Sequence, residues 1–175
     1  MPTLDTGRTA LVLVDLMERI VALPLAPRPG TDVLAAAARL ADTFRAAGAP
    51  VVHIRVERPN VEAQPPGSDL VPDLVRDGEP VVVKRTIGGF QDTGLHELLT
   101  GFGATTLVFG GIATNLGVES TARAAAGAVP GPAPCHGRPS DTGESWWFTS
   151  PVTHQSLARL GNSCRTIEPP RGSRV

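Results

Sequence analysis

Short apolar runs alternate with amphipathic or polar stretches through the first 126 residues of the chain. Four runs rich in Val, Leu, Ile or Phe, at residues 9–15, 50–56, 80–84 and 105–109, predict strands buried on both faces. Apolar residues recur at helical spacing over residues 32–47 and 114–126, and a shorter helix is expected near 93–99. This order predicts a single domain over residues 1–175: a three-layer α/β/α fold with a mostly parallel, Rossmann-like sheet.

Local signals predict where these helices begin and end. Thr31 is the expected N-cap of the first helix, and Gly48 is expected to follow its last turn. Asp92 or Thr93 is expected to cap the short helix, and Thr114 the last one. Side-chain oxygens at these positions can accept hydrogen bonds from the unpaired amides of a first turn.

The pattern breaks after residue 126. Residues 127–145 contain four prolines and four glycines and no apolar run. Proline cannot donate to a sheet ladder, so the strand expected next is predicted to be missing or distorted. Two origins are open, a compensated frameshift in the coding sequence or a loop particular to this lineage. A lost strand would expose the edge of its neighbour and part of the core, which would favour either association between copies of the chain or poor stability.

Charge and hydropathy narrow the classes of function. The net charge is −1 and the arginines are scattered, which gives no electrostatic basis for binding nucleic acid. No apolar run approaches the roughly 18 residues that span a bilayer, so no membrane partner is expected. The first residues contain no signal-peptide core, and Cys135 and Cys164 form no disulfide framework, so we expect a cytoplasmic location.

Residues with chemical potential follow three of the predicted strands. Asp15 and Lys84 end two of them, and the Gly110-Gly111 turn follows a third. Ligands of open α/β sheets bind at the carboxyl ends of strands, so these segments are expected to meet at one edge. Each residue also has a structural alternative, since Asp15 could pair with Arg19 and Lys84 could face solvent.

Three segments together resemble the isochorismatase-like (cysteine hydrolase) superfamily. They read TALVLVDLMERIV, VVVKRTIGGF and VFGGIATNLGVESTARAAA, in that order, and cover most of residues 8–126. The resemblance implies that Asp15 is the acid/base residue and Lys84 its neighbour. It also implies a cis peptide bond at Ile112-Ala113 and places Gly117 where the cysteine hydrolases carry their nucleophile.

Gly117 supplies no thiol, which excludes a thioester route at this position. The isochorismatase branch of the superfamily also has glycine there. Its chemistry, carried over, implies that Asp15 protonates a vinyl ether without a covalent intermediate. The helix expected to begin at Thr114, after the Gly110-Gly111 turn, would offer unpaired backbone amides that could bind an anion. The expected substrate-binding residues are therefore Ile112, Ala113, Thr114, Asn115, Leu116 and Phe90.

The resemblance predicts a hydrolase acting on a small anionic or amide-bearing metabolite, working as a homodimer or larger homo-oligomer. The alternative is an inactive relative that binds a small ligand or a partner. Nicotinamidase-like members carry an Asp/His metal cluster after the second strand, but residues 53–69 contain a single histidine, His53, and lack the second one. We therefore expect no metal and no cofactor, and interpret His53 as a packed core residue. The Cys135-His136 pair, in the proline-rich segment, is not expected to be catalytic.

Overall fold

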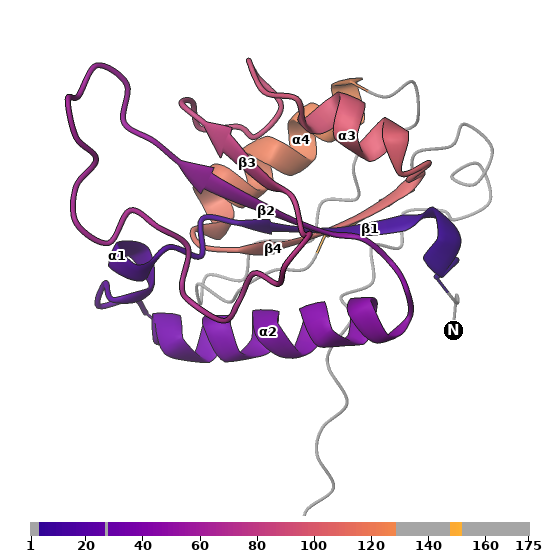
Figure 1. Ribbon diagram of the computed structural model, residues 1–175, viewed down its shortest axis with the longest axis horizontal. Helices are drawn as coiled ribbons and strands as arrows, with labels where there is room; N and C mark the ends of the chain where they lie inside the picture. The colour runs from indigo at the N-terminus through magenta and orange to yellow at the C-terminus, as the bar shows by residue number, and fades with distance from the viewer. Residues whose placement is uncertain (1–3, 27, 129–147, 152–175) are drawn as a thin grey trace, which may run out of the picture.

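A five-stranded sheet forms the centre of the computed structural model, which describes residues 4–26, 28–128 and 148–151 (Figure 1). The strand order is β3-β2-β1-β4-β5. The strands are β1 (Thr9–Val14), β2 (Val51–Val56), β3 (Val81–Lys84), β4 (Thr106–Gly111) and β5 (Phe148–Pro151). The first four are mutually parallel, and β5 pairs antiparallel with β4. The predicted mostly parallel sheet is confirmed.

Helices cover both faces of this sheet, which confirms the three-layer α/β/α prediction. The helices are α1 (Glu18–Val21), α2 (Gly30–Ala46), α3 (Leu95–Gly101) and α4 (Glu119–Ala128), with a 3-10 turn η1 (Thr6–Arg8) and a π-helical turn η2 (Thr114–Val118). Figure 1 shows α2 beneath the sheet and α3 and α4 above it.

Strand β1 divides the core because its side chains alternate between the two faces. Leu11 and Leu13 pack with α2, whereas Val12 and Val14 pack with α3 and α4. All six residues of β1 are buried. Burial on both faces explains why the sequence shows a continuous apolar run rather than an alternating one.

Of the two predicted ends of the first long helix, the start is wrong and the end is confirmed. Helix α2 begins at Gly30 with Pro29 as its N-cap, so Thr31 lies inside the first turn. Gly30 is required there because a Cβ would lie 2.2 Å from the Val21 carbonyl oxygen. Gly48 follows the helix at φ +70°, as predicted.

The other two caps also differ from the prediction. Helix α3 begins after Gly94, although the Thr93 hydroxyl accepts a hydrogen bond from the Leu95 amide at 3.4 Å. The last helix does not begin at Thr114, because the π-helical turn η2 precedes α4. The spacing of apolar residues predicted that the helices exist, but the start of α2 was decided by its close packing against the Val21 carbonyl.

The long polar excursion between β2 and β3 docks against the segment that follows β1. The Glu18 amide donates to Asp69 O at 3.1 Å, and the Val71 amide donates to Leu16 O at 3.1 Å. Met17 and Leu70 form an antiparallel bridge. These bonds attach the excursion to the carboxyl end of β1, so it becomes a wall of the region next to Asp15.

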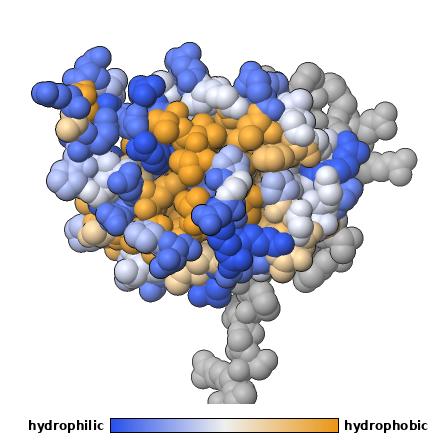
Figure 2. Space-filling view, in the orientation of Figure 1, coloured by the Kyte–Doolittle hydropathy of each residue, from blue (hydrophilic) through white to orange (hydrophobic). Residues whose placement is uncertain are grey.

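The edge strand β3 lies on a face where apolar side chains gather. Figure 2 shows a hydrophobic area in the middle of the viewed face, bordered by polar side chains. Val81 of β3 is exposed over 42% of its surface. Residues 129–147, which include most of the proline-rich segment and the Cys135-His136 pair, and residues 152–175 lie outside the described residues. No helix in the described part of the chain combines the length and hydropathy needed to cross a membrane.

The strand order reverses between β1 and β4. From β1 the chain proceeds outward through β2 to β3, and it then returns to place β4 on the other side of β1. Such a reversal opens a crevice at the carboxyl ends of the two central strands. Asp15 follows β1 at that crevice, and the turn η2 follows β4.

Candidate active site

Asp15 is the first residue after β1, and its backbone is left-handed at φ +55°. Its amide donates to Ile54 O at 2.8 Å, which extends the parallel ladder by one step. Aspartate tolerates this conformation better than most residues because its short polar side chain can bond locally. The residue is 7% exposed, so the turn places a carboxyl group inside the protein at the end of a central strand.

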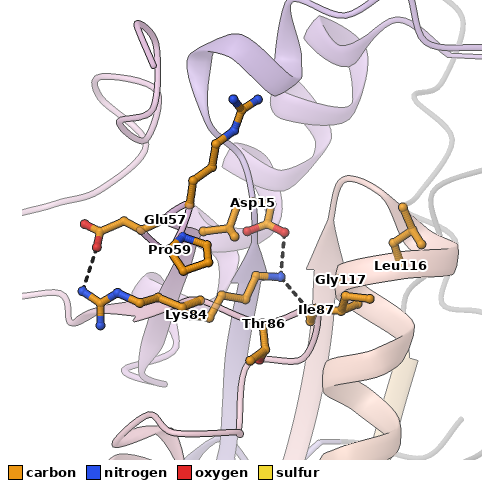
Figure 3. Close-up of a pocket in the computed structure, with 11 residues that line it drawn as sticks. Asp15, Glu57, Pro59, Lys84, Thr86, Ile87, Leu116 and Gly117 are labelled. Carbon is orange, nitrogen blue, oxygen red and sulfur yellow. Dashed lines mark hydrogen bonds and ion pairs between the residues drawn. The ribbon is translucent and has the colours of Figure 1, made fainter. Parts of the chain in front are cut away.

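Lys84 ends β3 and reaches across the end of β2 to Asp15. Its Nζ lies 2.7 Å from Asp15 Oδ2 and donates to Ile87 O at 2.8 Å (Figure 3). The residue is only 1% exposed, which rules out the alternative of a solvent-facing lysine. The sequence placed Asp15 and Lys84 at one edge of the sheet, and the structure joins them in a buried ion pair.

The two oxygens of Asp15 have different surroundings. Oδ2 pairs with Lys84, while Oδ1 is buried and has no hydrogen-bond partner among the described residues. Burial raises the pKa of the Asp15 carboxyl, and the Lys84 ammonium and the more distant Arg19 offset only part of that rise. Arg19 bonds Ser68 instead of pairing with Asp15. A carboxyl with a raised pKa and an unpaired oxygen is suited to hold and donate a proton.

Gly117 lies directly against this ion pair. A Cβ built on Gly117 would come within 2.7 Å of Asp15 Oδ2 and 2.9 Å of Lys84 Nζ. Real Cβ atoms do not approach polar atoms so closely, so any side chain here requires the pair to move. The three residues that the sequence grouped as one site therefore do meet, and the ion pair occupies the space where a side chain at position 117 would begin.

The ion pair faces an open cleft of about 320 Å³. Val56, Glu57, Arg58 and Pro59 form one side; Asp15, Lys84, Arg85, Thr86, Ile87, Leu116 and Gly117 complete the lining. Figure 3 shows Leu116 and Ile87 on the Gly117 side of the ion pair and Glu57 and Pro59 on the other. Both apolar residues are more than half exposed, at 61% for Ile87 and 56% for Leu116.

Of the six predicted substrate-binding residues, Leu116 is the one that lines the cleft as the structure describes it. Its amide donates to Ala113 O at 3.2 Å and is already paired. Ile112 and Phe90 pack against the two hydrophobic clusters of the core instead. The Ile112-Ala113 peptide is cis, as predicted. Two further predicted residues, Thr114 and Asn115, begin the turn η2.

Sequence reasoning missed Thr121, which is fully buried in α4. Its Oγ1 donates to Gly117 O at 2.6 Å and accepts from the Gly89 amide at 3.0 Å. The spacing of four residues could have predicted the bond to Gly117, since helical threonines often bond the carbonyl one turn back. The bond to Gly89, 32 residues away, depends on tertiary packing.

The cleft also carries charged residues that the sequence did not single out. The Glu57 carboxylate accepts from Arg55 Nη2 at 2.7 Å and from Arg85 Nη2 at 3.0 Å. Arg58, on the same side, is exposed and makes no side-chain hydrogen bond to the described residues, while Gln64 bonds its backbone amide and carbonyl. Cationic side chains therefore outnumber carboxylates on this wall.

His53 belongs to a separate cluster at the amino end of β3. It is fully buried, as predicted, and its Nε2 lies 2.8 Å from Glu79 Oε2. Arg45 binds both oxygens of Glu79, at 2.6 and 2.7 Å. Within the described residues no three His, Cys, Asp or Glu side chains are grouped to hold a metal ion, and the expectation of a metal-free protein stays a prediction.

Comparison with known proteins gives a consistent family. Residues 9–128 match the model of the Isochorismatase domain. The uncharacterized isochorismatase family protein YecD of Escherichia coli O157:H7 is 35% identical over 137 residues, 69% of this chain and 73% of YecD. An isochorismatase family structure from Burkholderia thailandensis superposes with a TM-score of 0.59 at 38% identity, covering 71% of this chain and 74% of that one. N-carbamoylsarcosine amidase from Thermoplasma acidophilum superposes with a TM-score of 0.61 at 26% identity, covering 67% and 75%.

Proposed function

This chain belongs to the isochorismatase family, and we propose that it is a hydrolase that cleaves a small anionic metabolite by proton transfer from Asp15. One observation carries the proposal. The Asp15 carboxyl is buried, has an unpaired Oδ1 and a raised pKa, and borders a cleft beside a residue with no side chain. This arrangement supplies an acid and offers no nucleophile at position 117.

The proposed reaction begins with a protonated Asp15. Oδ1 donates its proton to the carbon of an enol ether or to a leaving group, and the new carboxylate is stabilised by Lys84 at 2.7 Å. Water adds to the cation that results and gives up a proton to Asp15, so the acid is restored and one water molecule is consumed. For an enol ether the hemiketal formed then collapses to a ketone and an alcohol. No step requires a thiol.

Charge and exposure in the cleft support an anionic substrate with an apolar part. The lining contains three cations, Lys84, Arg58 and Arg85, and two carboxylates, Asp15 and Glu57. This excess of positive charge attracts anions to the cleft. The exposed Ile87 and Leu116 can cover the apolar part of a ligand, where burying their surface would favour binding.

The comparisons also suggest amide hydrolysis as a reaction to test, since one structural neighbour is named as N-carbamoylsarcosine amidase.

The second candidate function is ligand binding without turnover. Gly117 favours it, because a glycine cannot act as a nucleophile. In that case Asp15 and Lys84 would bind a ligand and not transfer a proton.

Assays of the purified chain against isochorismate and against amides, nicotinamide and N-carbamoylsarcosine among them, test the proposal. Turnover of the enol ether that is lost in Asp15→Asn supports Asp15 as the acid. Asp92→Asn is the matched control, because Asp92 is an exposed aspartate with nearly the same backbone conformation, φ +53°. Equal turnover by Asp15→Asn and the wild type would refute the assignment. Binding without turnover of any compound would favour the second function.

A further inference from the structure

The loop that follows Lys84 is seated on the first turn of α4. A Cβ on Gly88 would lie 3.1 Å from Ser120 Oγ, and a Cβ on Gly89 would lie 3.0 Å from Thr121 Cγ2. The two glycines therefore let the loop backbone approach the helix closely. Gly89 is buried and its amide is hydrogen-bonded.

The hydroxyl of Thr121 joins this loop to the turn that contains Gly117. The Gly89 amide can only donate, so Thr121 Oγ1 accepts from it at 3.0 Å. Its own proton is then available for Gly117 O, at 2.6 Å. One fully buried hydroxyl thus satisfies a donor from one segment and an acceptor from another.

Both of these segments touch the Asp15–Lys84 pair. Lys84 Nζ donates to Ile87 O at 2.8 Å, and Ile87 lies two residues before Gly89. On the other side, the backbone of Gly117 bounds the space in which the ion pair lies. If the loop moved away from α4, the carbonyl that orients the lysine would move with it.

We propose that Thr121 is a positioning residue that couples the loop after Lys84 to the Gly117 turn and so fixes the lysine against Asp15. This inference rests on the proposed function for its consequence in catalysis. Its structural content, the link between Thr121 and the Asp15–Lys84 pair, can be measured without substrate. Thr121 touches neither the cleft nor the reacting atoms, so its effect passes through Lys84 and Gly117.

The experiment is a ¹³C NMR titration of the Asp15 carboxyl in the intact protein. Thr121→Val preserves the shape of the side chain but removes both hydrogen bonds. Lys84 lowers the pKa of Asp15 in the wild type, so a displaced lysine should raise that pKa further. Thr121→Ser keeps the hydroxyl and should titrate like the wild type. An unchanged or lowered Asp15 pKa in Thr121→Val would overturn the proposal.

Two further variants separate positioning from general loosening of the fold. Thr43→Val removes a hydroxyl that bonds the carbonyl four residues back, at 2.9 Å to Arg39 O, but that bonds no second segment. It should leave Asp15 unchanged, and a shift as large as that of Thr121→Val would overturn the proposal. In a Lys84→Met background, Thr121→Val should no longer move the Asp15 pKa, because the coupling passes through the lysine. A persisting shift would contradict the proposed route.

If Thr121→Val does not fold, Gly89→Ala performs the same test. Its Cβ would lie 2.7 Å from Ile54 Cδ1 and 3.0 Å from Thr121 Cγ2, so the loop must move away from α4. The Asp15 pKa should rise in this variant too, and an unchanged value would overturn the proposal. Because all these titrations use protein without substrate, an absence of turnover would disprove the proposed function and leave the Thr121 result standing.

Discussion

Two carboxylates, the buried Asp15 at the carboxyl edge of the sheet and the half-buried Glu79 at the amino edge, have opposite protonation behaviour. Glu79 accepts from Arg45, from the Arg76 amide and from His53, and although burial acts to raise its pKa, these donors lower it to about 2. Asp15 has Lys84 on one oxygen and no partner on the other, and its pKa is raised.

The difference shows that burial alone does not decide what an acid can do. A carboxylate surrounded by enough donors stays ionised and ties segments together, here α2, β2 and the start of β3. When a buried carboxyl has too few hydrogen-bond donors, burial raises its pKa, and the group can then carry a proton. We therefore expect mutations at the two edges to separate activity from stability.

Asp15→Asn should give the largest effect, and only on activity. Losing the proton donor should reduce turnover by about 10²–10⁴-fold. Stability should change by less than about 1 kcal/mol, because the protonated Asp15 of the proposed mechanism is already neutral and the amide oxygen that replaces it can still accept from Lys84. Steady-state rates and urea unfolding of the same preparations measure both quantities. A large loss of stability would show that Asp15 resembles Glu79 after all.

Glu79→Gln should show the reverse pattern. A folded-state pKa of about 2, against 4.5 for an ordinary glutamate, corresponds to at most about 3 kcal/mol of stability at neutral pH, and solvent screening of this half-buried group reduces that value. This stability is present above pH 4.5 and is lost as the pH falls toward 2, so the variant should lose the corresponding acid-unfolding slope. Turnover at 25 °C should stay near the wild-type rate. Urea unfolding as a function of pH checks this, and a variant as stable as the wild type at pH 7 would contradict the comparison.

Gly117→Ala tests whether the catalytic edge tolerates one added carbon. Its Cβ would lie 2.7 Å from Asp15 Oδ2, so the ion pair must shift, at a cost of about 1–3 kcal/mol in stability with a loss of activity. Gly94→Ala is the matched control, because nothing lies within 4 Å of a Cβ there and its φ is −84°. Equal effects of the two substitutions would remove the special role assigned to Gly117.

His53→Gln should give the smallest effect, confined to mildly acidic pH. Burial lowers the pKa of His53 below its ordinary 6.5, although Glu79 opposes the shift. The unfolded chain is then protonated first, so wild-type stability declines as the pH falls below about 7. Glutamine can keep the hydrogen bond to Glu79 without titrating. The decline between about pH 7 and 5 should flatten by less than about 1 kcal/mol, and an unaltered slope would assign it to another group.

The sequence predicted most of the fold and the members of the candidate site because both have local signatures. Continuous apolar runs identified the four parallel strands, and the charges at the ends of β1 and β3 pointed to Asp15 and Lys84. The helix starts were less predictable. Thr31 is a good capping residue, yet α2 starts two residues earlier than predicted, at Gly30, where the helix lies in close contact with the Val21 carbonyl.

By itself, the sequence determined that an acid, a lysine and a glycine follow strands that end at one edge of a parallel sheet. Only the tertiary structure decided their relation, because it depends on atoms brought together from distant segments. It set Lys84 2.7 Å from one oxygen of Asp15 and left the other unpaired. It also placed Thr121 between Gly89 and Gly117 and surrounded Glu79 with donors. Side-chain types fix which charges are available, whereas the number of donors that reach each buried carboxyl fixes where its proton resides.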